Sequence, residues 1–214
     1  MQQPFLDNEL VTESFTNKQL NLHDYLLIIS PSEDVQQKIT EIKKQFSIEV
    51  DCPAALHGKP QITLLRFLQM EMMERKIVAK MKLLIEAASS FQIVIDGFGS
   101  FPSHTIYANI TTKNNIINLV KSLKPLQPLV KLDKWNKGHF ITEPHITIAR
   151  KLLPFQYEKG WNKYMHENFK SSFMVNEILL LKRQINNKNF SIVTQFVLLN
   201  KVAPTVTQNS LLFL

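Results

Sequence analysis

Apolar residues along the chain recur with two different spacings, and the order of these spacings predicts an α+β protein. Alternation of apolar and polar residues is typical of strands, whereas spacings of three and four are typical of the buried side of a helix. The pattern favours strands at residues 25–30, 60–66, 91–97, 105–111, 144–150, 173–183 and 190–200, and helices at residues 33–46, 69–88, 113–124 and 155–169.

Two of the helical patterns indicate which side chains fill the core. In residues 69–88 the apolar side chains form one stripe, so we interpret its methionines as core residues and not as a ligand set. In residues 155–169 the inward residues are predicted to be Trp161, Met165 and Phe169. The stripe of the longer helix consists of Met70, Met73, Ile77, Met81, Leu84, Ile85 and Ala88.

One short segment of the chain occurs twice. Residues 60–66 read PQITLLR and residues 144–150 read PHITIAR, so proline, isoleucine, threonine and arginine coincide, and Leu64 corresponds to Ile148. Around each copy the predicted elements follow the same order of strand, helix, motif strand, helix, strand, strand. The second copy takes its opening strand from the end of the first. This order predicts two α+β lobes that share one continuous body.

Each copy of the motif, taken as a strand, divides its side chains between two faces. One face is aliphatic and should be buried under helices, whereas the other is polar and suits the wall of a cleft. Residues two apart on a strand are roughly 6.5–7 Å apart, so an imidazole and a hydroxyl on the polar face can flank one phosphate. The aliphatic set is Ile62, Leu64, Ile146 and Ile148, and the polar set is Gln61, Thr63, His145 and Thr147.

The duplicated motif resembles the signature of the 2H phosphoesterases, H-x-T-x found twice. Residues 145–148 match it fully, and residues 61–64 match it in all but the histidine, which is Gln61 here. Arg150 stands where the RNA ligase-like branch of this family often has a phosphate-contacting arginine. The resemblance extends from about residue 25 to residue 200. It implies two pseudo-symmetric lobes, each a mainly antiparallel sheet with helices on its outer face, and an active-site cleft between them.

The resemblance also implies a ligand and a set of site residues. The ligand would be an RNA terminus or a nucleotide with a 2′,3′-cyclic or 2′-5′ phosphodiester, handled without a metal or another cofactor. His145, Thr147 and Thr63 would be catalytic, and Gln61 and Arg150 would bind the substrate. The type of reaction would be that of a cyclic phosphodiesterase or a 2′-5′ RNA ligase.

Gln61 leaves the catalytic status of the chain open. Glutamine can donate and accept hydrogen bonds but cannot transfer a proton near neutral pH. Three interpretations remain: activity reduced to what His145 supplies alone, a non-catalytic module that binds nucleotides or RNA on the same scaffold, or replacement of the lost imidazole by His57 or His139.

Other residues have less specific patterns. We interpret Arg66 as a solvated charge at a strand end. Several aromatic residues can stack on a base, although such residues more often belong to the core. Lysines around Trp135 form a basic patch that either contacts an RNA backbone or is a solvated loop. The aromatic residues are Phe67, Phe101, Tyr107 and Trp135, and the lysines are Lys131, Lys134 and Lys137.

Composition adds limits to this picture. The chain has 214 residues, 44% hydrophobic, a net charge of +7 and one cysteine, Cys52. The charge favours phosphate-bearing partners, and the lone cysteine fits a reducing, cytoplasmic setting. We expect an N-terminal extension over residues 1–24 without a signal peptide, one bilobal domain over 25–200 and a tail over 201–214. No membrane association is expected, and the chain should act as a monomer.

Overall fold

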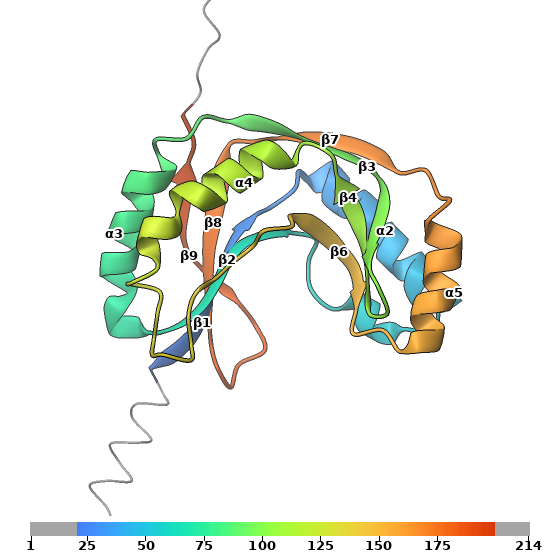
Figure 1. Ribbon diagram of the computed structural model, residues 1–214, viewed down its shortest axis with the longest axis horizontal. Helices are drawn as coiled ribbons and strands as arrows, with labels where there is room; N and C mark the ends of the chain where they lie inside the picture. The colour runs from blue at the N-terminus through green and yellow to red at the C-terminus, as the bar shows by residue number, and fades with distance from the viewer. Residues whose placement is uncertain (1–20, 200–214) are drawn as a thin grey trace, which may run out of the picture.

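The computed structural model describes residues 21–199, which form two antiparallel sheets arranged as an arch (Figure 1). The first sheet has the strand order β5-β2-β1-β8-β9, and the second has the order β6-β4-β3-β7. The strands are β1 (Leu22–Ile29), β2 (Ile62–Met70), β3 (Phe91–Phe101), β4 (Thr105–Ile110), β5 (His139–Phe140), β6 (His145–Arg150), β7 (Lys170–Val175), β8 (Glu177–Gln184) and β9 (Ser191–Val197). The predicted α+β class with two mainly antiparallel lobes is therefore confirmed.

Each sheet carries helices on one face only. α3 and α4 pack on the first sheet, whereas α2 and α5 pack on the second, and Figure 1 shows these helices around the outside of the arch. We call the two helix-free faces the inner faces. The helices are α2 (Glu33–Glu49), α3 (Glu74–Ile85), α4 (Lys113–Ser122) and α5 (Pro154–Tyr164), and short 3₁₀ turns lie at Pro53–Leu56, Glu71–Met73 and Lys124–Leu126.

The two lobes are interleaved and do not correspond to the two halves of the chain. α2 follows β1 of the first sheet but packs against β6 and β7 of the second. In the same way, α4 follows β4 of the second sheet but contacts β2 of the first. The single strand predicted at residues 173–183 is wrong for this reason: β7 pairs with β3 in the second sheet, β8 pairs with β1 in the first, and the chain crosses between them at Asn176.

The predicted core stripe over residues 69–88 is partly correct. β2 continues to Met70, so the helix begins at Glu74 and not at residue 69. Within α3, Ile77, Met81 and Ile85 are fully buried, which confirms the interpretation of this stripe as core.

The predicted helix over residues 155–169 is also partly correct. α5 ends at Tyr164, and the Met165 that follows is 48% exposed, against the prediction that it points inward. Trp161 and Phe169 do pack against the core, as predicted.

Parts of the predicted ends of the chain fall outside the described residues. The expected extension over residues 1–24 is described only from residue 21, and β1 already begins at Leu22. The expected tail over 201–214 lies wholly outside the described part. Among the helices of residues 21–199, none is both long and apolar enough to cross a lipid bilayer.

The packing of α2 on the second sheet predicts a large loss of stability when its anchor is removed. Phe46 is fully buried, lies 5.3 Å from the ring of Tyr164 and closely approaches Gly160 of α5. Phe46→Ala should lower the free energy of unfolding by about 3–5 kcal/mol. The matched variant Ile48→Ala, on the same helix but 82% exposed, should change it by less than about 0.5 kcal/mol. Urea denaturation measures both, and equal effects would contradict this packing.

Candidate functional site

The two copies of the motif lie on neighbouring strands, β2 and β6, which contact each other where the lobes meet (Figure 1). β5 pairs with β2 through Leu65 and Arg66, and the amide of Ile141 donates to the carbonyl of Leu64 over 3.0 Å. Only three residues then separate Ile141 from His145 at the start of β6. The second motif is therefore held close to the first by backbone hydrogen bonds.

Both motif strands carry the same irregularity, one residue after the threonine. In β2 the pairing with β1 passes from Thr63 to Leu65, which leaves Leu64 as an extra residue. In β6 the pairing with β4 passes from Thr147 to Ala149, which leaves Ile148 as an extra residue. An extra residue of this kind is a β-bulge, and it reverses the alternation of the side chains that follow it.

The bulges decide on which face the two arginines lie. Without a bulge, a residue three positions after a threonine would point to the opposite face. With Leu64 and Leu65 both buried, and Ile148 and Ala149 likewise, the arginine that follows each pair returns to the face of the threonine. Arg66 and Arg150 therefore lie on the inner faces with Thr63 and Thr147.

The predicted division of the motif side chains agrees with their burial. The four aliphatic residues, Ile62, Leu64, Ile146 and Ile148, are at most 1% exposed. The four polar residues are half-buried, and strand alternation places them opposite the helix-covered faces. The structure therefore brings Gln61, Thr63, His145 and Thr147 onto inner faces of adjacent strands.

The imidazole of His145 has a defined hydrogen-bonding arrangement. Its Nδ1 lies 2.7 Å from the carbonyl oxygen of Glu143, and only a protonated Nδ1 can donate to that acceptor. In the neutral ring, Nε2 is then the nitrogen with a free lone pair. The carboxylate of Glu143 is itself paired with Lys113 at the start of α4. His145 is thus positioned by its own loop and by a helix that packs on the other lobe.

Two aromatic rings enclose the imidazole on the inner face of the second sheet. The ring centroid of Phe101 lies 5.0 Å from that of His145, at an interplanar angle of 81°, and that of Tyr107 lies 4.9 Å away. A side chain at Gly99 would place its Cβ 2.5 Å from the Tyr107 ring, so this ring position requires glycine there. The sequence left Phe101 and Tyr107 without an assigned role, and the structure places both against His145.

Burial is the main influence on the charge of His145. Desolvation lowers the pKa of its imidazole below the ordinary value, against the opposing effects of the Glu143 carbonyl and carboxylate, while the nearby charge of Lys113 lowers it further. Burial also raises the pKa of Tyr107, so its phenol stays protonated. At neutral pH the site therefore presents a neutral imidazole, which can accept a proton, next to a phenol hydroxyl that can donate a hydrogen bond.

Gln61 occupies the position in the first motif that His145 occupies in the second. Within residues 21–199, the side-chain amide of Gln61 makes no hydrogen bond. Its NH₂ group can therefore donate to a ligand and its carbonyl oxygen can accept from one. The loop before it is held by Lys43 of α2, whose Nζ donates to the carbonyls of His57 and Gly58 over 3.1 and 2.6 Å.

The two arginines of the repeat have different surroundings. Arg150 is exposed, and within the described part of the chain its guanidinium makes no ion pair. Arg66 lies in the middle of β2 and forms a two-point ion pair with Asp24, with N–O distances of 2.9 and 2.7 Å. The interpretation of Arg66 as a solvated charge at a strand end is therefore wrong, because its partner on β1 is distant in sequence and was not visible in the pattern.

The remaining candidates are spread over the molecule. His139 is exposed and pairs with Arg66 across β5 and β2, so it lies on the inner face of the first sheet. His57 is exposed after the 3₁₀ turn that precedes Gln61. Phe67 is a core residue that stacks on Tyr25, and Trp135 is 81% exposed in the loop before β5. Lys131, Lys134 and Lys137 are exposed in the same loop.

Among residues 21–199, no group of three or more His, Cys, Asp or Glu side chains is placed to hold a metal ion.

Comparisons with known proteins agree with this architecture. A model of the 2′-5′ RNA ligase superfamily matches residues 31–187 of the chain. Similar solved structures include E. coli LigT complexed with 3′-AMP, with a TM-score of 0.60, 15% sequence identity, and coverage of 83% of this chain and 98% of that one. The comparison with curated protein sequences gives no match.

Two further solved structures share the fold, with comparably low sequence identity. The protein TT0787 of Thermus thermophilus has a TM-score of 0.56 and 15% identity, covering 81% of this chain and 97% of that one. Usb1 of Kluyveromyces marxianus has a TM-score of 0.52 and 10% identity, covering 83% and 98%. At these identities the similarity shows the fold alone.

The surroundings of His145 predict its titration. Because its folded pKa lies below the unfolded value of about 6.5, the ring should stay neutral through pH 7 and gain its proton only as the pH falls through the lowered pKa. Lys113→Gln should raise this pKa, since it removes a positive charge and frees the Glu143 carboxylate. The control Lys121→Gln removes the same charge from the other end of α4 and should leave the pKa unchanged. Nitrogen-15 NMR titration of the imidazole measures all three, and a pKa above 6.5 in the unaltered protein would contradict the arrangement.

Proposed function

We propose a function that proceeds from one premise: the chain belongs to the 2′-5′ RNA ligase superfamily. The resemblance of its repeat to the 2H phosphoesterases is thereby confirmed. We infer that the chain binds an RNA terminus or a nucleotide at a 2′,3′-cyclic or 2′-5′ phosphodiester, between β2 and β6. We further infer that it hydrolyses this bond slowly, with His145 as its one acid–base group. The observation that carries the proposal is the orientation of His145, whose Nδ1 faces the Glu143 carbonyl and whose Nε2 is left for a ligand, on the face that Thr147 shares.

The proposed reaction is hydrolysis of the cyclic phosphodiester. Nε2 of His145 takes a proton from a water molecule as the water oxygen forms a bond to phosphorus. The bond from phosphorus to one ribose oxygen breaks, and that oxygen takes up a proton to become a hydroxyl. The hydroxyls of Thr63 and Thr147 donate to the non-bridging oxygens, where negative charge increases in the transition state. Arg150 adds a positive charge on the same face.

Gln61 accounts for the expected slowness of this reaction. A second histidine at its position would donate the proton to the leaving ribose oxygen, but an amide can only hydrogen-bond to that oxygen. Solvent then has to supply this proton. General acid catalysis by one group contributes about 10²–10⁴-fold, so binding should be kept while turnover is reduced by roughly this factor.

Gln61 also favours a second candidate function, binding without catalysis. If solvent cannot reach the leaving oxygen, the site binds nucleotides or RNA without turning them over. This non-catalytic module would use the same contacts, with Gln61 as a neutral hydrogen-bonding group. Support for a nucleotide ligand in either case comes from the E. coli LigT structure, which contains 3′-AMP. The expectations of a cytoplasmic setting, a monomeric state and no membrane association belong to this proposal as well.

Restoring the missing histidine should restore the chemistry. Hydrolysis of a 2′,3′-cyclic nucleotide, followed by chromatography, should be slow with the unaltered protein and faster by about 10²–10⁴-fold with Gln61→His. His145→Ala should abolish turnover in the unaltered background and reduce it by about 10²–10⁴-fold in the Gln61→His background, whereas His166→Ala, at an exposed position beyond α5, should not change it. Binding without turnover by the unaltered protein, together with turnover by Gln61→His, would identify the non-catalytic module. If neither protein binds or hydrolyses the nucleotide, the proposal fails.

Neither of the two other candidate histidines should take over the role lost at Gln61. His139 lies opposite Arg66, five positions along the strand from Gln61, which is roughly 16 Å at 3.3 Å per residue. His57 is exposed in the loop that Lys43 holds in place. His139→Gln and His57→Gln should therefore each leave the rate of mononucleotide hydrolysis essentially unchanged. A loss comparable to that of His145→Ala would show that the altered histidine acts in catalysis.

A further inference from the structure

The inner face of the first sheet holds two arginines around one buried carboxylate. Asp24 is 3% exposed. It accepts two hydrogen bonds from Arg66, at 2.9 and 2.7 Å, and two from Arg183 of β8, at 3.1 and 2.8 Å. Arg66 belongs to the motif strand, whereas Arg183 comes from the far end of the chain.

These arginines lie on the same face as the proposed phosphodiester site. On β1, Asp24 pairs with Arg183 of β8 and Leu26 pairs with Arg66 of β2. Asp24 and Leu26 are two residues apart, so both arginines lie on the same face of the sheet, the inner face. The bulge at Leu64 returns Arg66 to the side of Thr63. Thr63 and Arg66 are three positions apart, roughly 10 Å along the strand. A ligand phosphate held at Thr63 would thus have the arginine pair as its neighbour.

The pair keeps unused positive charge and unused donors. One carboxylate balances one guanidinium, so the group retains a net charge of +1. Each arginine uses only Nε and Nη2 toward Asp24, which leaves both N–H bonds of each Nη1 without an acceptor among residues 21–199. The side chains are 48% and 29% exposed, respectively. Arg183 is also held from the other side, since the Phe190 ring lies 4.5 Å from its guanidinium carbon.

We propose that Arg66 and Arg183, fixed by Asp24, form a second phosphate site that takes the next phosphate of an RNA strand whose end lies between β2 and β6. This inference rests on the proposed function and names its substrate class: a short RNA, preferred over a mononucleotide. Arginine suits the role because its planar donors match phosphate oxygens and because its orientation is already fixed before binding. His139, exposed and opposite Arg66, borders the same site.

An ion pair with only a structural role would need one arginine at Asp24, whereas the molecule provides two. One arginine, bonded at two points, already satisfies the charge of a buried carboxylate. The second arginine adds an uncompensated charge on a face that no helix covers, and Phe190 holds its guanidinium in one orientation. Such an arrangement is stabilised further by an anion, and the backbone phosphates of RNA supply one.

The test compares ligands of different length. Titration calorimetry measures the dissociation constants of uridine 3′-phosphate and of uridine oligonucleotides two to four residues long that carry a 3′-phosphate. With the unaltered protein, the first added nucleotide should tighten binding by about tenfold or more, the range of a hydrogen bond to a charged group. Arg183→Gln should remove most of this gain and leave the affinity for uridine 3′-phosphate within about twofold. Lys76→Gln, which removes an equal charge from the exposed side of α3, should keep the full gain.

Two further measurements keep the outcomes distinct. Phe190→Leu retains an apolar contact but removes the aromatic ring face under Arg183, so it should remove part of the increase in affinity with length. Circular dichroism shows whether Arg183→Gln folds. If that variant does not fold, Phe190→Leu provides the test of the second site. The second site is overturned if affinity does not increase with oligonucleotide length, or if Arg183→Gln and Phe190→Leu both keep the full increase. In either case, binding of uridine 3′-phosphate still upholds the proposed function. If neither the mononucleotide nor any oligonucleotide binds, both proposals are overturned together.

Discussion

The pairing of residues 139–141 with β2 is the constraint on which the site depends. The strands β2 and β6 belong to different sheets, which are covered by different helices. The hydrogen bond from Ile141 to Leu64 joins the first motif to the segment that leads into the second. Because only three residues lie between Ile141 and His145, this hydrogen bond limits how far the imidazole can lie from Thr63. The main chain therefore restrains the distance between the two polar faces.

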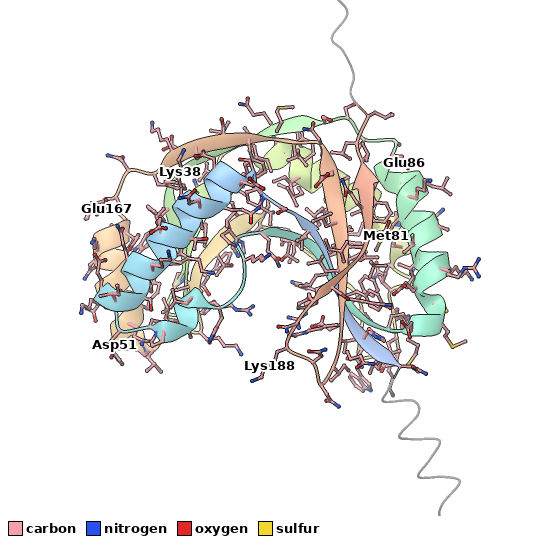
Figure 2. The ribbon with its side chains drawn as sticks, turned by 180° about the vertical axis from the view of Figure 1, so that it is seen from behind. Lys38, Asp51, Met81, Glu86, Glu167 and Lys188 are labelled. Atoms are coloured by element: carbon pink, nitrogen blue, oxygen red, sulfur yellow. The ribbon has the colours of Figure 1, made fainter. Side chains whose placement is uncertain are left out.

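The interleaving of the lobes adds a second restraint on the same geometry. α2 connects β1 and β2 of the first sheet but packs on the second, and α4, which follows β4 of the second sheet, packs on the first. Separating the lobes would expose both helix faces together with the sheets beneath them, at a cost of about 25 cal/mol for each square ångström of apolar surface. Lys113 extends this coupling to the site, since it stands at the start of α4 on one lobe and pairs with Glu143 next to His145 of the other. The site is thus assembled from two lobes that these helices tie together, and Figure 2 shows the same arch from behind.

The two copies of the motif have the same backbone arrangement but different side-chain chemistry. Both have the bulge, the threonine and the arginine on the inner face. The second copy places a histidine among aromatic rings and leaves Arg150 unpaired within the described residues, which suits reaction at a phosphate. The first copy has Gln61 in place of the histidine, and its Arg66 is bound to Asp24, which suits holding a ligand. The proposed function therefore assigns acid–base chemistry to one lobe and fixed hydrogen-bond donors to the other.

The sequence by itself determined the elements that depend on local pattern: the repeat, the two faces of each motif strand, and the placement of His145, Thr147, Thr63 and Gln61 on one kind of face. The sequence also contains two apolar residues in a row before each arginine, but this irregularity indicates a bulge only once the pairing with β1 and β4 is known. Only the tertiary structure decided which sheet each helix covers, where the strand predicted at residues 173–183 divides, and that Asp24 lies between Arg66 and Arg183. The physical reason is that alternation along a strand reports burial at each position, whereas an apolar helix face fits either sheet and a buried carboxylate can be neutralised by an arginine from anywhere in the chain. Which partner each takes is settled by long-range packing, for which a single sequence has no local signal.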